Sequence, residues 1–153
     1  MPASFFCCAL PGKCRLHRPR CLRPRRQHHR SPANQYPERI RLSGIDCHEK
    51  GQAYGKRAKQ AASALAYGKE VTLQTHGKDR HKRILGDVIL PDGTNVNHAL
   101  VKEGCCWWYR RYAPGDIVLE KQEREAREAK RGLWVDPHPV PPWEWRSDKT
   151  FGR

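Results

Sequence analysis

Three charged residues, Arg41, Asp46 and Glu49, lie close together in the segment IRLSGIDCHE (40–49). Carboxylates are the ligands that a hard, oxygen-bound cation prefers, and a glutamate can also orient or deprotonate a water molecule. An arginine offers a forked pair of donors to phosphoryl oxygens. Together these residue types could bind a cation, a water molecule and an anion, and a strand followed by a turn has little use for so many charges.

Each of these three residues also has an ordinary structural explanation. An arginine on a strand is usually solvated or ion-paired, and an aspartate after a strand often forms a turn. A glutamate at this position could simply begin a helix. The segment alone leaves both interpretations open, and the rest of the chain has to decide between them.

The charge of the chain indicates a polyanionic partner. Its 153 residues carry a formal net charge of +14, and half of it lies in residues 1–38, which hold eight Lys or Arg and one acid. No apolar run approaches the roughly 20 residues of a membrane-spanning helix. We therefore expect a polyanionic partner such as nucleic acid and no membrane span. We also predict a monomeric chain.

Residues 1–38 differ in composition from the rest of the chain. They contain half of the twelve prolines and four of the seven cysteines, and the stretch CRLHRPRCLRPRRQHHR shows neither helical nor strand periodicity. We expect a disordered basic segment here. A secretory signal fits poorly, because the apolar stretch SFFCCALPG precedes the positive charges and is broken by Pro11. The sequence therefore gives no prediction of the cellular compartment.

The cysteines do not indicate a disulfide framework. Cys47 and the adjacent pair at 105 and 106 form an odd set, and neighbouring cysteines rarely bridge each other. A zinc site is the alternative for the N-terminal segment, since Cys7, Cys14, Cys21 and His28 recur every seven residues. Structural zinc sites usually contain close C-x₂₋₄-C pairs, however, and this spacing has none.

From residue 39 onward the pattern is that of a folded α+β domain. The expected strands cover residues 39–44, 69–75 and 83–90, and the expected helices cover 52–67, 95–104 and 116–130. The intervening segment CCWWYRRYAPG and the Pro- and Trp-rich tail 135–153 are expected to be irregular. Three strands are too few to enclose a core for this much apolar surface.

The order of these motifs resembles the staphylococcal nuclease-like (thermonuclease) family. The resemblance covers about residues 39–134 and rests on IRLSGIDCHE, the following helix, a hairpin carrying DRHKR, the helix GTNVNHALVKEG and a final helix ending in GLW. The family's fold is a five-stranded OB barrel with three helices, and OB barrels commonly bind nucleic acid. The resemblance implies a Ca²⁺-dependent phosphodiesterase that cuts DNA and RNA at the 5′ P–O bond.

The resemblance also assigns roles to seven residues of this chain. Two arginines hold the phosphate, a glutamate handles the attacking water, and an aspartate binds Ca²⁺ beside a backbone carbonyl at position 47. The matching positions are Arg41, Glu49 and Arg83 for catalysis, Asp46 for the metal, and Arg80, His81 and Tyr112 for nucleotide contacts. Arg83 also has an ordinary explanation, as a charge on an edge strand that discourages aggregation.

The aromatic residues of the C-terminal half have two interpretations. Aromatic rings interleaved with arginines can stack on bases, and they can equally pack a core that is short of large apolar residues. We expect Trp107 and Trp134 to pack in the core. Trp143 and Trp145, in PPWEWR, are expected to hold the tail against the domain.

Two features depart from the family pattern. His48 stands where the family usually has proline, so the loop that carries Glu49 lacks proline's fixed φ. The family also has two further strands upstream, with an acidic junction resembling D-G-D-T that supplies a metal ligand, and residues 1–38 contain no aspartate. We therefore expect a barrel that lacks its first two strands, and hypothesise an incorrect reading frame upstream of about residue 38.

An incomplete site leaves other functions open besides the nuclease. The basic domain could bind nucleic acid without cutting it, or the chain could be a fragment that misfolds. Cleavage that requires Ca²⁺ separates the first two functions, because a binding module would show salt-sensitive binding alone.

Overall fold

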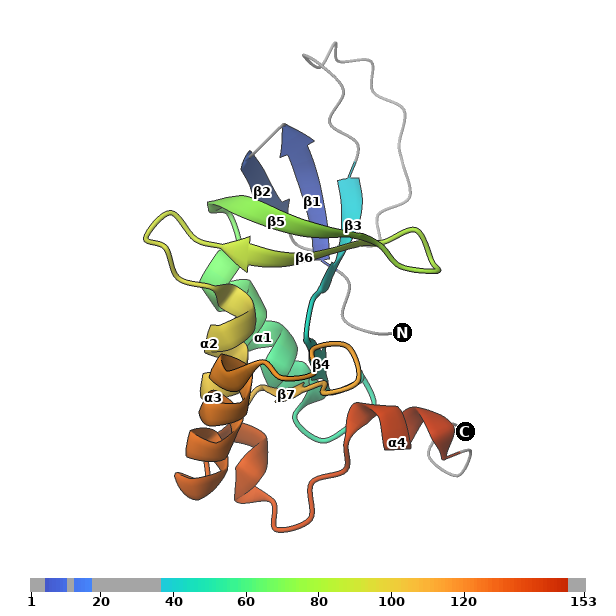
Figure 1. Cartoon of the computed structure of the whole chain (residues 1–153), viewed down its shortest axis with the longest axis vertical. Coiled ribbons are helices and arrows are strands. Elements are labelled where there is room, and N and C mark those ends of the chain that lie inside the picture. The colour runs from blue at the N-terminus through green and yellow to red at the C-terminus, as the bar shows by residue number, and fades with distance from the viewer. Residues whose placement is uncertain (1–4, 11–12, 18–36, 149–153) are drawn as a thin grey trace.

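Five strands form a closed barrel at one end of the molecule (Figure 1). The structure is a computed structural model and describes residues 5–10, 13–17 and 37–148. Around the barrel the order is β1 (Phe5–Leu10), β2 (Lys13–His17), β5 (Glu70–Lys78), β6 (Ile84–Ile89) and β3 (Pro37–Leu42). Neighbouring strands are antiparallel except β3 and β6, which run parallel. The predicted α+β class is confirmed.

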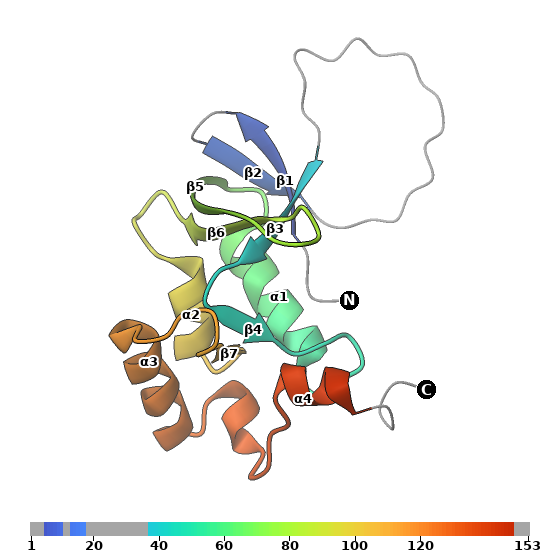
Figure 2. The ribbon, with the colours of Figure 1, turned by 45° about the vertical axis from the view of Figure 1, so that its right-hand side comes forward.

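The helices lie below the barrel, as Figures 1 and 2 show. They are α1 (Gly55–Ala66), α2 (Val96–Lys102), α3 (Ile117–Glu128), a 3₁₀ turn at Gly132–Val135 and the short α4 (Pro142–Ser147). A two-stranded sheet of β4 (Ile45–Cys47) and β7 (Cys106–Trp108) lies among them. In the part of the chain that the structure describes, no helix combines the length and apolarity needed to cross a membrane.

Capping side chains fix where the helices begin. The side chain of Asn95 accepts hydrogen bonds from the backbone N–H groups of residues 97 and 98, and Asp116 accepts from residues 118 and 119. Both residues satisfy donors that the first helical turn would otherwise leave unpaired. They begin the short and long helices that the sequence predicted over 95–104 and 116–130, and both helices are confirmed.

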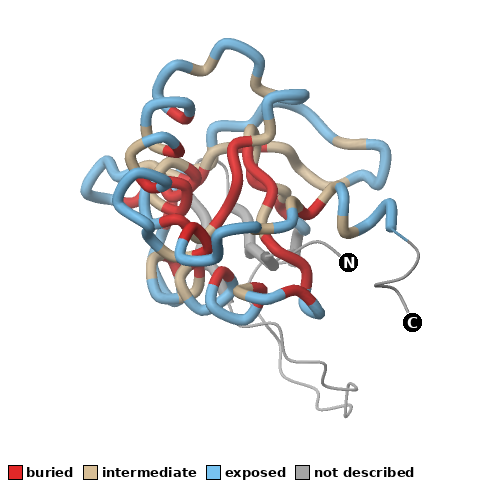
Figure 3. Tube along the Cα trace, turned by 90° about the horizontal axis from the view of Figure 1, so that it is seen from below, coloured by how far each residue is buried: buried red, intermediate tan, exposed pale blue. Residues whose placement is uncertain are grey.

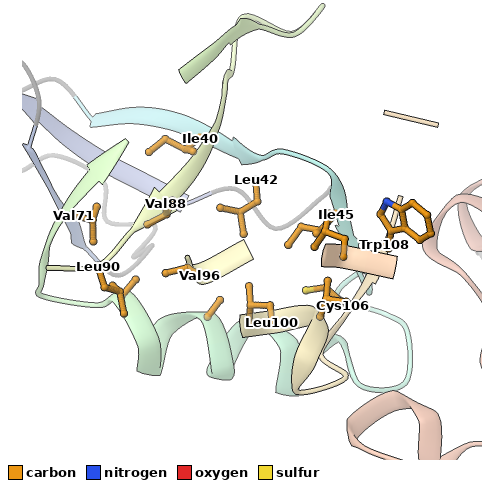
Figure 4. Packing of buried hydrophobic residues seen from close by; sticks show 14 residues of the cluster. Ile40, Leu42, Ile45, Val71, Val88, Leu90, Val96, Leu100, Cys106 and Trp108 are labelled. Atoms are coloured by element: carbon orange, nitrogen blue, oxygen red, sulfur yellow. The ribbon is translucent and has the colours of Figure 1, made fainter. Parts of the chain in front are cut away.

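The core lies where the barrel meets α1 and α2. Figure 4 shows side chains from β3 and β6 pointing toward those of α2, and Figure 3 shows buried residues in the interior of the molecule with exposed residues around them. Ile40, Leu100 and Val101 are fully buried there. These contacts fix β3, and with it the segment that leads to Asp46, against the helical half of the molecule.

The structure differs from the sequence prediction at the first two strands. Residues 5–10 and 13–17 form β1 and β2, which pair with β3 and β5 and close the barrel. The alternation of Cys14 and Leu16 with basic residues in KCRLH is a five-residue strand pattern, and the longer Pro- and Arg-rich window concealed it. The prediction of missing strands is thus wrong. The hypothesis of an incorrect reading frame stays a prediction, because it also rests on the composition of residues 1–38 and on their lack of aspartate.

Two short elements occur where irregular structure was predicted. β7 forms in CCWWYRRYAPG because it pairs with β4 in the register Asp46↔Trp107. α4 forms in the proline-rich tail because Pro142 stands in its first turn, where a helix has no use for the missing N–H. The proposed zinc spacing at 7, 14, 21 and 28 lies outside the residues whose side chains are described.

Candidate active site

An open groove of about 1340 Å³ brings together most of the predicted site residues. Its walls come from β3, the β5–β6 hairpin, the loop after β7, and α4. Five of the seven predicted residues line it, namely Arg41, Arg80, His81, Arg83 and Tyr112. The groove also contains Arg39, Arg111 and Arg146, so its charge suits a polyanion.

The two predicted phosphate-binding arginines stand on neighbouring parallel strands. Arg41 lies on β3 opposite Leu85 of β6, and Arg83 directly precedes β6. Their side chains are 19% and 11% exposed. Although they are 42 positions apart in the sequence, the parallel pairing of β3 with β6 places both on one wall of the groove.

Asp79 organises the DRHKR turn around Arg83. Its carboxylate accepts hydrogen bonds from the backbone N–H groups of His81 (2.8 Å) and Arg83 (2.9 Å), and from Nε of Arg83 (2.7 Å). Nη2 of Arg83 lies 2.6 Å from Asp79 Oδ2. Burial of Asp79 opposes its ionisation, but these contacts with Arg83 and His81 lower the pKa of Asp79 to about 2. The turn is therefore held by a carboxylate that stays charged far into acid.

Asp79→Asn should destabilise the chain at neutral pH and destabilise it less in acid. The pKa of Asp79 falls from its ordinary value near 4 to about 2 in the folded chain. Its contribution to the free energy of unfolding is therefore complete above about pH 4 and is lost as the pH falls through about 2. We expect a loss of about 1–2 kcal/mol in the free energy of unfolding at pH 7. Urea unfolding at pH 7 and pH 2.5 measures it. An equal loss at both values would contradict this assignment.

The two predicted carboxylates, Asp46 and Glu49, are buried and do not line the groove. Asp46 lies on β4 opposite Trp107 of β7 and is 3% exposed, and Glu49 follows β4 and is 6% exposed. Buried carboxylates need a charged or hydrogen-bonding partner. For both residues this partner comes from the C-terminal helix.

Arg146 of α4 bridges the two carboxylates. Its Nη2 donates to Oδ2 of Asp46 at 2.5 Å, and its Nη1 donates to Oε1 of Glu49 at 3.0 Å and approaches Oδ1 of Asp46 at 3.4 Å. Arg41 lies further away, with Nη2 3.9 Å from Asp46 Oδ1. Partial burial opposes the charge of Arg146, but the hydrogen bonds that it donates to Asp46 and Glu49, and the charges of these carboxylates, raise its pKa.

The loop that carries Glu49 is held by buried polar contacts. Nε1–H of Trp107 donates to Nε2 of His48 (2.9 Å), so the other ring nitrogen of His48 carries the proton and donates to the Ala53 carbonyl (2.5 Å). The backbone N–H of Glu49 donates to Oε1 of Gln52 (2.9 Å). His48 thus supplies by hydrogen bonds the rigidity that a proline would supply through φ.

A close backbone contact explains the glycine that begins α1. A Cβ atom on Gly55 would lie 1.9 Å from the carbonyl oxygen of Glu49, which is impossible without moving one of the two segments. The start of α1 therefore packs directly against the loop of Glu49.

A disulfide joins the two strands beside Asp46. Cys47 and Cys106 face each other in the β4–β7 register and are bonded, with their Cα atoms 4.2 Å apart. The sequence did not indicate this disulfide. The pairing arises from strand register across 59 residues, and neither cysteine carries a local sequence signal for it.

Aromatic contacts hold the tail against the domain, as predicted. Trp107 and Trp134 are 6% and 8% exposed and meet edge to face with ring centroids 4.5 Å apart. Trp143 of α4 stacks on Tyr109 at 4.9 Å and meets the edge of Trp107 at 5.6 Å. The predicted core packing of the first two rings and the tail-anchoring role of Trp143 are confirmed.

Sequence reasoning missed Asp79, Arg146 and Asn97. Asp79 stands four residues before Arg83, a spacing that could have suggested the ion pair. Asn97 is buried and donates to the Ser43 carbonyl (3.0 Å), which ties the β3–β4 turn to α2, but it reads as an ordinary helix residue. Arg146 is 100 positions from Asp46, and no spacing rule connects them.

Comparisons with known proteins agree with this architecture. A family model described as "Staphylococcal nuclease homologue" matches residues 39–136. A protein called an uncharacterized endonuclease from Escherichia coli is 49% identical over 111 residues, covering 72% of each chain. A micrococcal nuclease from Shigella flexneri is 40% identical over 122 residues, covering 74% of this chain and 70% of the relative. A probable staphylococcal-like nuclease from Oryza sativa subsp. japonica is 40% identical over 114 residues, but only 34% of its length is covered.

Proposed function

The chain belongs to the family of staphylococcal nuclease homologues, and on this premise we propose that it is a nuclease that hydrolyses DNA and RNA with the help of Ca²⁺. The proposal rests on one observation: arginines of the basic groove and buried carboxylates lie next to each other. Arg41 lines the basic groove and also approaches Asp46, which shares a guanidinium with Glu49. Phosphate-binding donors and acidic groups are thereby neighbours, as phosphodiester hydrolysis requires.

The acidic residues suit a hard cation. Asp46 and Glu49 are buried, and oxygens of both carboxylates contact the same guanidinium, so that group stands in for a positive ion at this point. Among the described residues, no group of three or more His, Cys, Asp or Glu side chains converges. Backbone carbonyls, for which we propose Cys47, and water would complete the ligand set. A bound Ca²⁺ would neutralise charge on the phosphate and lower the pKa of water.

Residues of the chain would bind the phosphate and activate the water. Arg41 and Arg83 would hold the phosphoryl oxygens, on which charge increases in the transition state. Glu49 would orient the attacking water and take its proton. Neighbouring residues restrict the movement of Arg83 and Glu49, since Asp79 holds the guanidinium of Arg83 and Gln52 binds the backbone of Glu49. Little reorganisation is then needed when the substrate binds.

The exposed residues of the groove would bind the rest of the substrate. Arg80 and His81 lie in the β5–β6 turn, where Nε of Arg80 donates to Nε2 of His81 at 3.1 Å. Tyr112 is 67% exposed and lines the same groove. We assign phosphate contacts to Arg80 and His81, and base stacking to Tyr112. The closed barrel accords with the OB fold that the resemblance implies, a common platform for single strands.

A cleavage assay with and without Ca²⁺ tests the proposal. The full chain should cut single-stranded DNA and RNA, release products with a 5′ hydroxyl from cleavage of the 5′ P–O bond, and lose activity when a chelator removes the cation. Retention of full activity with excess chelator would refute the role of Ca²⁺, and absence of cleavage at any Ca²⁺ concentration would refute the nuclease.

A nucleic-acid-binding module without catalysis is the second candidate. The observation that favours it is the limited ligand set, because Asp46 and Glu49 are paired with Arg146 and no third carboxylate joins them among the described residues. Such a module would retard single-stranded DNA with strong salt dependence and would produce no cleavage products in the same assay.

A further inference from the structure

The acidic residues of the proposed cation site already hold a positive group from the same chain. Three of the contacts between Arg146 and the two carboxylates fall within 3.4 Å, and the shortest, to Asp46 Oδ2, is 2.5 Å. Ca²⁺ needs its oxygen ligands at about 2.3–2.6 Å. A cation bound by both Asp46 and Glu49 would therefore require the same oxygen atoms and the same space, and it would also be repelled by the guanidinium.

Arg146 covers these carboxylates from the side of the groove. Its side chain is 35% exposed and lines the groove, whereas the side chains of Asp46 and Glu49 are 3% and 8% exposed and do not. In Figures 1 and 2, α4 lies beside β4, at the end of the molecule away from β1 and β2. A cation that enters from the groove thus meets the guanidinium first.

Besides the ion pairs of Arg146, uncharged contacts hold helix α4 in this position. Trp143 stacks on Tyr109 at 4.9 Å with an interplanar angle of 7°. The side chain of Gln52 donates to the Val140 carbonyl at 2.9 Å, which links the tail to the loop of Glu49. Because α4 is only six residues long, its place depends on these contacts rather than on its own stability.

We propose that Arg146 competes with the catalytic cation for Asp46 and Glu49, so that docked α4 inhibits the site and cation binding displaces the guanidinium. This inference rests on the proposed function, since it concerns the regulation of the same site. When only a fraction of molecules has the guanidinium displaced, the apparent Kd for the cation rises in inverse proportion to that fraction. Removing Arg146 should therefore tighten cation binding.

Calorimetric titration of the full chain with Ca²⁺ tests the proposal. Arg146→Gln removes the charge and the forked contact, and we expect its Kd to fall by at least about tenfold relative to the unmodified chain. Arg124→Gln is the matched control, because it removes the same charge from an exposed position on α3. We expect its Kd to stay within about twofold of the unmodified chain, since solvent and salt screen the exposed position.

A second variant tests the docking of α4 separately from the charge of Arg146. Trp143→Ala leaves Arg146 in place but removes the stacking on Tyr109, so it should tighten Ca²⁺ binding by a smaller factor, about threefold. Thermal unfolding shows whether each variant is folded. Arg146→Gln leaves two buried carboxylates without the guanidinium, and we expect a lowered Tm without Ca²⁺ and a larger rise on adding Ca²⁺ than in the unmodified chain.

The outcomes distinguish this inference from the nuclease itself. A Kd for Arg146→Gln equal to that of Arg124→Gln, or no Ca²⁺ binding in either, overturns the competition. An unchanged Kd in folded Trp143→Ala overturns the role of α4 docking. If Ca²⁺-dependent cleavage is found without tighter binding in Arg146→Gln, the inference fails and the nuclease stands. If Arg146→Gln binds Ca²⁺ more tightly and no variant cuts nucleic acid, the inference stands and the nuclease fails.

Discussion

Glu49→Gln should lower the rate of phosphodiester cleavage by about 10²- to 10⁴-fold. The glutamine has nearly the same size as the glutamate, but its amide cannot take a proton from water and is a weaker ligand for a hard cation. The local backbone should be retained, because the contact of the Glu49 N–H with Gln52 does not involve the substituted side chain. Single-turnover rates on single-stranded DNA at saturating Ca²⁺ measure the loss in the chemical step.

Glu128→Gln is the control for this experiment. It makes the same chemical change at an exposed position at the end of α3, and its cleavage rate should stay within about twofold of the unmodified chain. Circular dichroism and thermal unfolding verify that Glu49→Gln is folded. A folded Glu49→Gln variant that cuts within threefold of the unmodified rate would contradict the assigned role of Glu49.

Local signals in the sequence predicted the helices and part of the barrel well. Asn95 and Asp116 cap the helices that the pattern placed after them, and the alternation around Ile40 is a barrel strand. Each of these signals is complete within a few residues, because a cap or an alternation depends on nearest neighbours along the chain. Five of the seven site residues likewise meet in one groove, since the family motifs carry the long-range information that spacing lacks.

Contacts between distant segments could not be predicted in the same way. The disulfide of Cys47 with Cys106 follows from the register of β4 and β7, and the ion pairs of Arg146 with Asp46 follow from the docking of α4. Neither pair is marked by its own residue types, since arginines and cysteines are spread along this chain. The barrel strands β1 and β2 were missed for a related reason, because the surrounding Pro- and Arg-rich sequence conceals their pattern and their pairing with β3 and β5 is a contact between distant segments.

Arg83→Ala should lower kcat/KM for cleavage by about 10²- to 10³-fold, which corresponds to roughly 3–4 kcal/mol of transition-state stabilisation. Arg83 is a strong candidate for this role because its guanidinium is already held by Asp79, with Nε–Oδ2 and Nη2–Oδ2 distances of 2.7 and 2.6 Å. A donor held in advance loses less entropy when the phosphate binds. Rates at substrate concentrations below KM measure the effect directly.

Arg83→Lys tests whether geometry or charge is responsible. The ammonium of lysine keeps the positive charge but cannot hold Asp79 and a phosphoryl oxygen with a planar fork. The kcat/KM of Arg83→Lys should therefore exceed that of Arg83→Ala by at most about tenfold. Arg80→Ala, an exposed position of the same turn, should cost about tenfold or less, because an exposed phosphate contact positions the substrate and is screened by solvent. Full recovery with lysine would mean that a point charge suffices at this position, and the orientation of Arg83 by Asp79 would then have no catalytic role.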